Sequence, residues 1–358
     1  LHFSNIRSDG SYIEGTGGKS SGIVPFLRVY NEVSRAFNQG GKRLGRFAIY
    51  LEPHHADIAD FLEIRKNHGE ENRRAKDLFI GLWISDLFMK RVRDHAKWSV
   101  FDPSQCTDLF GDEYEAKYLE YESRGLAVKT YQAREIWKMI FMSQKESGIP
   151  YICYKDAVNR YNNQANLGVI KSSNLCTEIM EYSSSSEYAC CCLASICLSK
   201  FVKDSAKDPN HEFPKEPYFD FKHFTEDAKM LVKNLNKIID NNFYPVPETK
   251  TSNMLHRPIG VGVQGLCDVF YKFGVPFDSP TATKLNKMIF ETLYFATLSA
   301  SAIQSRQEYL EYVSKCREEG SVVIPIYFKQ GNKLSQKKVK YTNPDDIPTD
   351  VCAYSSFR

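Results

Sequence analysis

The sequence lacks a hydrophobic run long enough to cross a bilayer. Its longest apolar stretch, Tyr188 to Leu198, has eleven residues, whereas a membrane-spanning helix needs about 20. A strong charge imbalance is missing as well, because 47 Lys and Arg residues nearly balance 44 Asp and Glu residues and leave a net charge of +3. The two signs are interspersed. We therefore expect neither a membrane nor a nucleic acid as a principal partner.

Regular cysteine spacing is also missing. The ten cysteines show neither the pattern of a secreted disulfide framework nor the CxxC knuckles of a zinc site, which favours a reducing cytoplasmic compartment. Cys190, Cys191 and Cys192 are consecutive, so their sulfurs cannot easily turn toward one metal ion, and we predict no metal site. Because cysteine without a disulfide is among the most buried residue types, we expect at least two of these three to be buried.

The hydrophobic pattern predicts short strands alternating with longer helices. Helical spacing is found over residues 25–37, 55–67, 113–124, 132–147, 224–242 and 279–310. Strands are predicted over residues 46–52, 149–155 and 188–198. This alternation indicates an α/β architecture with largely parallel strand pairing. We expect one continuous domain over residues 1–305 and a divergent, polar, Lys-rich tail over residues 306–358.

Three short motifs invite a ligand-binding interpretation that their details do not support. "EGTGGKSSG" (residues 14–22) is not a phosphate loop, because Ile13 occupies the position of the first required glycine. "GVGVQG" (260–265) has no clear preceding strand, so we expect it to serve tight strand-to-helix packing. In "EPHHAD" (52–57) adjacent histidines at a strand end would point apart, which favours packing and hydrogen bonding over metal binding.

The stretch "SSNLCTEIMEYSSSSEYACCCLAS" (172–195) carries the strongest chemical signal. In an extended segment Asn174, Cys176 and Glu178 would project from one face. A carboxylate so close to a thiol disfavours the thiolate, so the cysteine is a poor conventional nucleophile. A protonated thiol beside a base and an amide suggests hydrogen-atom chemistry on a hydroxyl-bearing substrate. A strand with one polar face remains the alternative.

Longer motifs carry a family resemblance. "SNLCTEI", followed by a cysteine before "LAS", occurs in order with "IRSDGSYIEGTGG", "QGGKRLGRFAIYLEP" and "HRPIGVGVQGL" over about residues 4–305. This set resembles the large, catalytic subunit of class I ribonucleotide reductase. The resemblance implies part of a ten-stranded α/β barrel, incomplete at both ends. It also implies reduction of ribonucleoside diphosphates to deoxyribonucleoside diphosphates by thiyl-radical chemistry, for DNA precursor synthesis.

The resemblance assigns roles to the cysteine segment. Cys176 matches the radical cysteine that abstracts the ribose 3′-hydrogen, and Glu178 matches the base for the 3′-hydroxyl proton. Asn174 matches the amide that hydrogen-bonds there, and Leu175 lies within the same substrate-binding segment. Cys191 matches one member of the redox pair that reduces the 2′ position.

The neighbours of Cys191 and the family's partners add further expectations. Cys190 and Cys192 stand where the family usually has other residues, so the resemblance gives them no role, although Cys192 is the alternative redox thiol. Family members take their radical from a small subunit that contains a metal, are re-reduced by thioredoxin or glutaredoxin, and form homodimers. The resemblance implies these partners here.

The glycine-rich stretches resemble the family's two specificity loops. Arg7 and the loop through residue 22 match the first, which holds a deoxynucleoside triphosphate or ATP effector with magnesium. Gln39, Lys42 and Arg43 match the second loop, at about residues 39–46, which relays the identity of the effector to the substrate site.

Several parts of the family pattern are not found in this sequence. They include the upstream partner of Cys191, the paired tyrosines of the radical relay and the C-terminal cysteine pair. The alternative hypothesis is therefore a truncated or split homologue that binds nucleotide or a partner subunit without catalysis.

Overall fold

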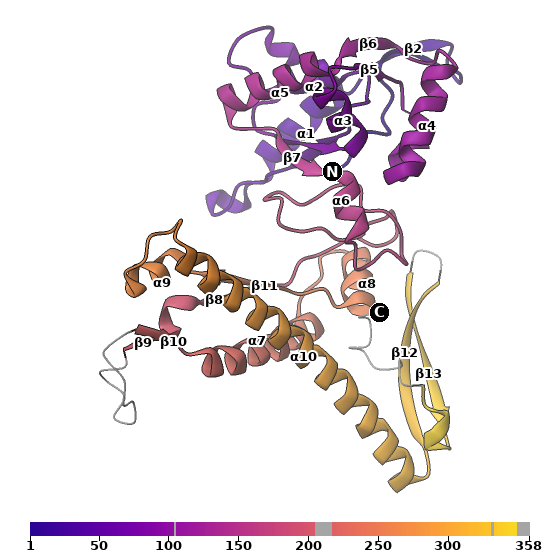
Figure 1. Cartoon of the computed structure of the whole chain (residues 1–358). Helices are drawn as coiled ribbons and strands as arrows, with labels where there is room; N and C mark the ends of the chain where they lie inside the picture. Colours follow the sequence, from indigo (N-terminus) through magenta and orange to yellow (C-terminus); the bar gives the residue numbers. More distant parts are fainter. Residues whose placement is uncertain (104, 205–216, 331–332, 349–358) are drawn as a thin grey trace. The chain divides into compact units, whose positions relative to one another are not determined.

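The computed structural model describes residues 1–103, 105–204, 217–330 and 333–348, and its elements are drawn in Figure 1. The chain divides into two compact units, residues 1–182 and residues 183–358. Each unit has its own sheet and core. In the described part of the chain, no helix combines the length and the hydrophobicity needed to cross a membrane.

A three-stranded parallel sheet forms the centre of the first unit. Its strands are β3 (Ala48–Leu51), β4 (Phe79–Ile84) and β7 (Tyr151–Tyr154), in the order β3-β4-β7. The short β-rich runs predicted over residues 46–52 and 149–155 and their parallel pairing are confirmed.

Helices and two pairs of antiparallel strands surround this sheet. The helices are α1 (Val24–Ala36), α2 (Ile58–Glu63), α3 (Asp86–Arg93), α4 (Gly111–Ser123), α5 (Ala133–Ser147) and α6 (Lys155–Arg160). The hairpin pairs β1 (Asp9–Ile13) with β2 (Gly18–Ser21), and β5 (Lys97–Val100) pairs antiparallel with β6 (Lys129–Gln132), which follows it after a 3-10 turn and α4. Short 3-10 turns are η1 (Gln39–Gly41), η2 (Glu71–Arg73) and η3 (Gln105–Asp108). Local sequence signals set the bounds, as in α5, where a capping box of Gln132 and Glu135 starts the helix and Gly148 ends it at φ 76°.

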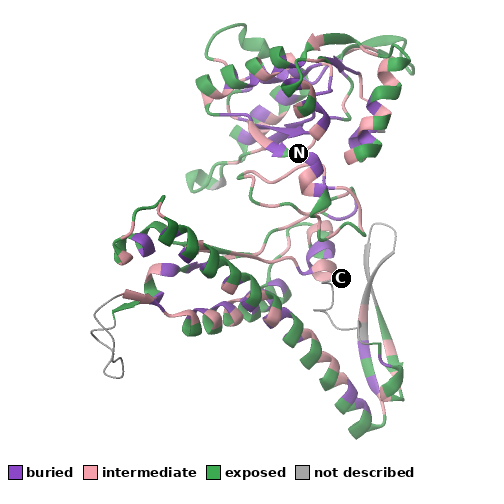
Figure 2. Ribbon diagram, viewed as in Figure 1, coloured by how far each residue is buried: buried purple, intermediate pink, exposed green. Residues whose placement is uncertain are grey.

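The two faces of the parallel sheet have different coverings, because successive side chains on a strand point to opposite sides. Ile49, Leu51 and Leu82 face the main core, which the helices complete. Tyr50 and Trp83 face the other side, where they form a small second core. Figure 2 shows β3 and β4 almost entirely in the colour of buried residues. The second face is the one that positions the candidate site.

The second unit is built around long helices. They are α7 (Phe221–Asn241), α8 (Pro247–His256), α9 (Leu266–Phe273) and α10 (Pro280–Glu319). β8 (Leu193–Cys197) pairs in parallel with β11 (Gly260–Gln264). After the turn η4 (Leu198–Phe201), β9 (Val202–Asp204) pairs antiparallel with β10 (Pro217–Phe219), and β12 (Val322–Gln330) pairs with β13 (Lys333–Tyr341), followed by η6 (Pro344–Asp346).

The prediction of one continuous domain followed by a polar tail is wrong in two respects. Contacts divide the chain after Tyr182, and α10 runs straight through the expected boundary at residues 305 and 306. Beyond that boundary, Val313 and Cys316 of α10 pack with Val322, Ile324 and Ile347. Lys337, Lys338 and Lys340, three of the lysines that suggested a tail, are exposed side chains of β13.

Two other predicted features need adjustment. Strand pairing is parallel in the central sheet and between β8 and β11, but it is antiparallel between β1 and β2, β5 and β6, β9 and β10, and β12 and β13, so "largely parallel" describes only part of the pairing. The motif at residues 260–265 is itself a strand, β11, and Gly265 at φ 74° starts α9. Strand-to-helix packing by this motif is therefore confirmed. The strand predicted over residues 188–198 is reduced to β8, after the cysteine triplet.

Candidate functional site

The segment that carries Cys176 is a closed loop and not an extended strand. Thr177 has φ 71°, which turns the chain between Cys176 and Glu178. The Asn174 Oδ1 atom accepts a hydrogen bond from the Ile179 backbone N at 3.1 Å, and the Ser173 hydroxyl donates to the Ile179 carbonyl at 2.6 Å. The prediction that alternating residues share one extended face is therefore wrong, because side-chain hydrogen bonds to the backbone replace strand pairing.

The loop presents its polar residues outward. Cys176 and Glu178 are exposed, and Asn174 is half-buried. Leu175 points the other way and packs against the second face of the sheet, beside the core formed by Tyr50 and Trp83. An apolar anchor thus fixes the loop on the sheet and leaves the thiol accessible to a reactant.

The base of the loop is held by side chains from α6 and η3. The Asn159 amide donates to the Ile170 carbonyl at 3.0 Å and its oxygen accepts from the Ile170 backbone N at 2.8 Å. Lys171 forms an ion pair with Asp108. The backbone N of Tyr182 donates to the Gln164 side chain at 2.8 Å at the far end. Both ends of the loop are therefore tied to the first unit.

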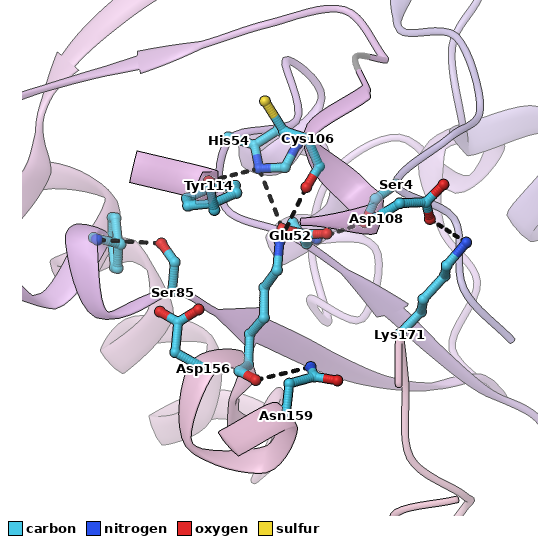
Figure 3. Close-up of polar contacts among 12 residues, drawn as sticks. Ser4, Glu52, His54, Ser85, Cys106, Asp108, Tyr114, Asp156, Asn159 and Lys171 are labelled. Atoms are coloured by element: carbon cyan, nitrogen blue, oxygen red, sulfur yellow. Dashed lines mark hydrogen bonds and ion pairs between the residues drawn. The ribbon is translucent and has the colours of Figure 1, made fainter. Parts of the chain in front are cut away.

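Beneath this base lies a buried polar network at the carboxyl ends of the parallel strands (Figure 3). Glu52 directly follows β3, and Lys155 directly follows β7. The Lys155 Nζ atom lies 2.6 Å from Glu52 Oε2 and 3.3 Å from the Cys106 carbonyl oxygen, and it sits 4.0 Å from the ring centroid of Tyr114. The His54 Nδ1 atom lies 2.9 Å from the Tyr114 hydroxyl and 3.4 Å from Glu52 Oε2.

Burial dominates the protonation of this network. It raises the pKa of Glu52 to about 7, although the Lys155 charge opposes the rise. Burial, assisted by Lys155, holds the pKa of His54 well below its usual value, so this imidazole is neutral. His55 bonds the Ile6 carbonyl at 2.7 Å. The packing and hydrogen-bonding role predicted for "EPHHAD" is confirmed, and in the described residues no three His, Cys, Asp or Glu side chains gather as metal ligands would.

The first predicted effector loop is the β1–β2 hairpin. The Asp57 carboxylate accepts from the backbone N of Asp9 at 3.0 Å and of Ile23 at 3.0 Å, which pins both ends of the hairpin. Arg7 is exposed, and its carbonyl accepts from the Ser20 hydroxyl at 3.4 Å. Hydrogen bonds to Asp57 thus fix the base of the hairpin, whereas its turn is exposed.

The second predicted effector loop follows α1. Gly40 and Gly41 have φ 64° and 79°, a conformation that favours glycine. The Gly45 backbone N donates to the Phe37 carbonyl at 2.7 Å, so the segment returns on itself. Lys42 and Arg43 are exposed on it. The side chain of Gln39 lies outside the described part of the structure.

The cysteine triplet lies in the second unit and is not buried as predicted. Cys191 is exposed, and Cys190 and Cys192 are half-buried. The segment precedes β8 and so lacks the packing that strand pairing would give it. The Cys192 thiol donates weakly to the Leu235 carbonyl at 3.7 Å. Burial and the neighbouring Cys190 and Cys191 raise the pKa of Cys192.

Sequence reasoning missed the residues that support the loop. Tyr50, Asn159 and Lys155 were not singled out. One signal was available for Lys155: a charged residue directly after a buried strand lies at the carboxyl edge of a parallel sheet, where sites form. Tyr50 gave no such signal, because its partner Asn174 is 124 residues away in the sequence, and Asn159 lies within a helix without a motif around it.

These features define an α/β domain in which an exposed cysteine sits on a loop over one face of a parallel sheet. The family model of the ribonucleotide reductase barrel domain matches residues 1–341. The chain belongs to the ribonucleotide reductase family.

Curated relatives agree with this assignment. The chain is 54% identical over 309 residues to the ribonucleoside-diphosphate reductase large subunit of Arabidopsis thaliana, a match that covers 83% of this chain and 38% of the relative. It is 48% identical to the large chain of Neurospora crassa and 47% identical to the large subunit of Caenorhabditis elegans, each over 100% of this chain. The chain spans 36% and 43% of the length of these two relatives.

Proposed function

We propose that this chain is the cysteine-bearing part of a class I ribonucleoside-diphosphate reductase large subunit. The observation that carries the proposal is the exposed Cys176 on a hydrogen-bonded loop over the parallel sheet, in a chain that the family's barrel model matches over residues 1–341. The reaction is reduction of ribonucleoside diphosphates to deoxyribonucleoside diphosphates.

The loop geometry fits the roles proposed for its polar residues. Cys176, as a thiyl radical, takes the 3′-hydrogen atom from the ribose, and Glu178 takes the 3′-hydroxyl proton. Asn174 Oδ1 accepts a hydrogen bond from the Ile179 N–H. Its amide N–H groups therefore remain to donate to the substrate, since an amide has one acceptor and one donor end.

Both electrons of the net reduction come from a thiol pair, because the hydrogen atom and the proton taken from the 3′ position are returned to it. Cys191 and a second thiol become a disulfide, which supplies two electrons and two protons while the 2′-hydroxyl leaves as water. We propose Cys191 over Cys192 because it is the exposed member of the triplet. Thioredoxin or glutaredoxin would restore the thiols, and a small subunit that contains a metal would supply the radical.

Regulation is proposed to use the two glycine-rich loops. A deoxynucleoside triphosphate or ATP, with magnesium, would bind at the hairpin beside Arg7. The loop with Gln39, Lys42 and Arg43 would relay its identity to the substrate. The exposed cations on these loops support binding of an anionic ligand. A homodimer would be the assembled form.

The test uses the native polypeptide at its natural length, mixed with its small subunit. Cys176→Ser should abolish reduction of cytidine diphosphate while leaving binding of deoxynucleoside triphosphates unchanged. Cys267→Ser is the matched control, because Cys267 is an exposed cysteine on α9 without a proposed role. Reduction by Cys176→Ser would refute the assignment. Nucleotide binding without reduction in the unaltered protein would instead indicate a non-catalytic homologue.

A further inference from the structure

The loop that carries Cys176 is hydrogen-bonded to a tyrosine of the sheet. Tyr50 lies on β3, is fully buried, and faces the same side of the sheet as Trp83 and Cys153. Its hydroxyl donates to the Asn174 carbonyl oxygen at 2.8 Å and lies 3.3 Å from the Thr177 hydroxyl. Since the Tyr50 proton is used by the carbonyl, Thr177 is the donor in the second contact.

These two contacts bracket the cysteine. One partner lies two residues before Cys176 and the other directly after it. Thr177 is β-branched and has φ 71°, a conformation that such residues rarely adopt and that persists only where the surroundings hold it. The contact from Tyr50 is placed where it can stabilise this turn.

The position of the Tyr50 ring is itself fixed by its neighbours. Trp83 packs against it edge to face, with ring centroids 6.1 Å apart and an angle of 84°. Gly81, the register partner of Tyr50 on β4, leaves room for the ring, because a Cβ atom there would lie 2.4 Å from Tyr50 Cε1. Any side chain at position 81 would displace the ring and with it the hydroxyl.

The hydroxyl also stays a donor at neutral pH. Burial raises the pKa of Tyr50 to about 12. The bond to Asn174 is therefore not lost by ionisation over the range in which the protein works.

We propose that Tyr50 is a positioning residue, whose hydroxyl holds the Asn174 carbonyl and the Thr177 hydroxyl and thereby fixes the turn that presents Cys176. Tyr50 acts through the loop and does not itself contact the reacting atoms. Its catalytic consequence rests on the function proposed above, whereas its effect on the loop does not.

The experiment compares Tyr50→Phe with Tyr118→Phe in the native polypeptide at its natural length. Tyr118 is the matched control, because its buried hydroxyl also donates to a carbonyl, that of Ser99 at 2.8 Å, but it does so away from the loop. Two readouts need no enzyme activity. They are hydrogen exchange of the peptide that contains the Ile179 amide and the rate of Cys176 alkylation by iodoacetamide.

In Tyr50→Phe the Ile179 amide should exchange, and Cys176 should react, about fivefold faster than in the unaltered protein, as expected for loss of one hydrogen bond. Tyr118→Phe should change neither rate. Thr177→Val removes only the second contact and should give a smaller change in the same direction. It keeps the proposal testable if Tyr50→Phe does not fold. Unchanged rates in Tyr50→Phe, or equal changes in Tyr118→Phe, would overturn the proposal.

Catalysis provides a separate readout. Tyr50→Phe should lower kcat for diphosphate reduction with little change in KM, because the position of the loop affects the transition state more than it affects substrate binding. If the unaltered protein reduces no diphosphate, the proposed function fails, and the exchange and alkylation rates still decide the role of Tyr50. If the unaltered protein is active but Tyr50→Phe leaves the exchange and alkylation rates unchanged, the positioning role of Tyr50 is refuted and the proposed function stands.

Discussion

Each of the two units buries a cation, but in different surroundings. In the first, Lys155 is fully buried and pairs with Glu52, whose side chain is 1% exposed. In the second, the buried Arg257 donates to the Asn236 side chain at 3.1 Å and to Asp240 at 2.8 Å, and the Asp240 side chain is 43% exposed. The first pair is desolvated on both sides, whereas the second keeps one partner in water.

The difference shows where each unit concentrates electrostatic energy. Desolvating two charges is costly unless the pair stays intact, so loss of either member of a buried pair leaves an uncompensated charge. Glu52 and Lys155 follow the strands that flank β4, below the base of the Cys176 loop. The first unit therefore depends on one pair at the site, while the second spreads its charge toward solvent.

The largest expected effect is that of Lys155→Met. The substitution leaves Glu52 buried without its cation and should lower the free energy of unfolding of the first unit by about 3–5 kcal/mol. Trp83, Trp98 and Trp137, the three tryptophans of the chain, all lie in this unit, so urea unfolding followed by tryptophan fluorescence reports it selectively.

The double variant Lys155→Met with Glu52→Gln is the control for this prediction. It removes both charges and should be more stable than Lys155→Met alone. If the single variant loses less than about 1 kcal/mol, the value typical of an exposed pair, the contrast between the two units disappears.

A smaller effect is expected for Arg257→Met in the second unit. Loss of its hydrogen bonds to Asn236 and Asp240 should cost about 1.5–3 kcal/mol, since part of the interaction is already solvated. Hydrogen exchange of α7 and α8 measures this unit directly. The urea unfolding transition followed by tryptophan fluorescence should change little in Arg257→Met. A change as large as that in Lys155→Met would mean that the units do not unfold separately.

The pH dependence of the first unit tests its network more finely. The folded pKa of His54 is below its ordinary 6.5, so the unfolded chain binds the extra proton and stability falls as pH drops below 6.5. The folded pKa of Glu52, about 7, lies above its ordinary 4.5, so its contribution is present at low pH and lost as pH rises from 4.5 through 7. The two opposing trends overlap between pH 4.5 and 6.5.

Variants separate these trends. In Glu52→Gln the stability should fall with acidification below pH 6.5, with a slope of at most about 1.4 kcal/mol per pH unit. In His54→Gln it should instead rise as pH falls from 7. Urea unfolding from pH 4.5 to 8 measures both, and identical slopes in the two variants would contradict a lowered pKa of His54 beside a raised pKa of Glu52.

The smallest effect concerns thiol reactivity in the two units. Cys153 lies on the covered face of the sheet, and burial raises its pKa to about 11. Cys191 of the second unit is exposed. Iodoacetamide should therefore label Cys191 well before Cys153, as peptide mass spectrometry after timed quenching would show. Early labelling of Cys153 would mean that the loop does not cover that face.

Much of the fold follows from local signals in the sequence. The helical spacing of α5, with buried Ala133, Ile136 and Ile140, and the apolar run of β3 were readable because their period is set by the backbone. The domain boundary was not, because composition at residues 306–358 does not reveal that α10 continues. The helix is stabilised there by contacts with β12, which follows it almost directly, and with η6 farther along the chain.

The candidate site divides in the same way. The sequence by itself determined the family, and it selected Cys176, Asn174, Glu178 and the glycine-rich loops as candidates, because each motif is a property of residues close together along the chain. Only the tertiary structure decided that the cysteine segment is a turned loop, that Tyr50 and Asn159 hold it, and that Glu52 pairs with Lys155. Tyr50 and Asn174 are 124 residues apart, and Glu52 and Lys155 are 103 apart. Such contacts depend on how the parallel strands are ordered, and no local pattern encodes that order.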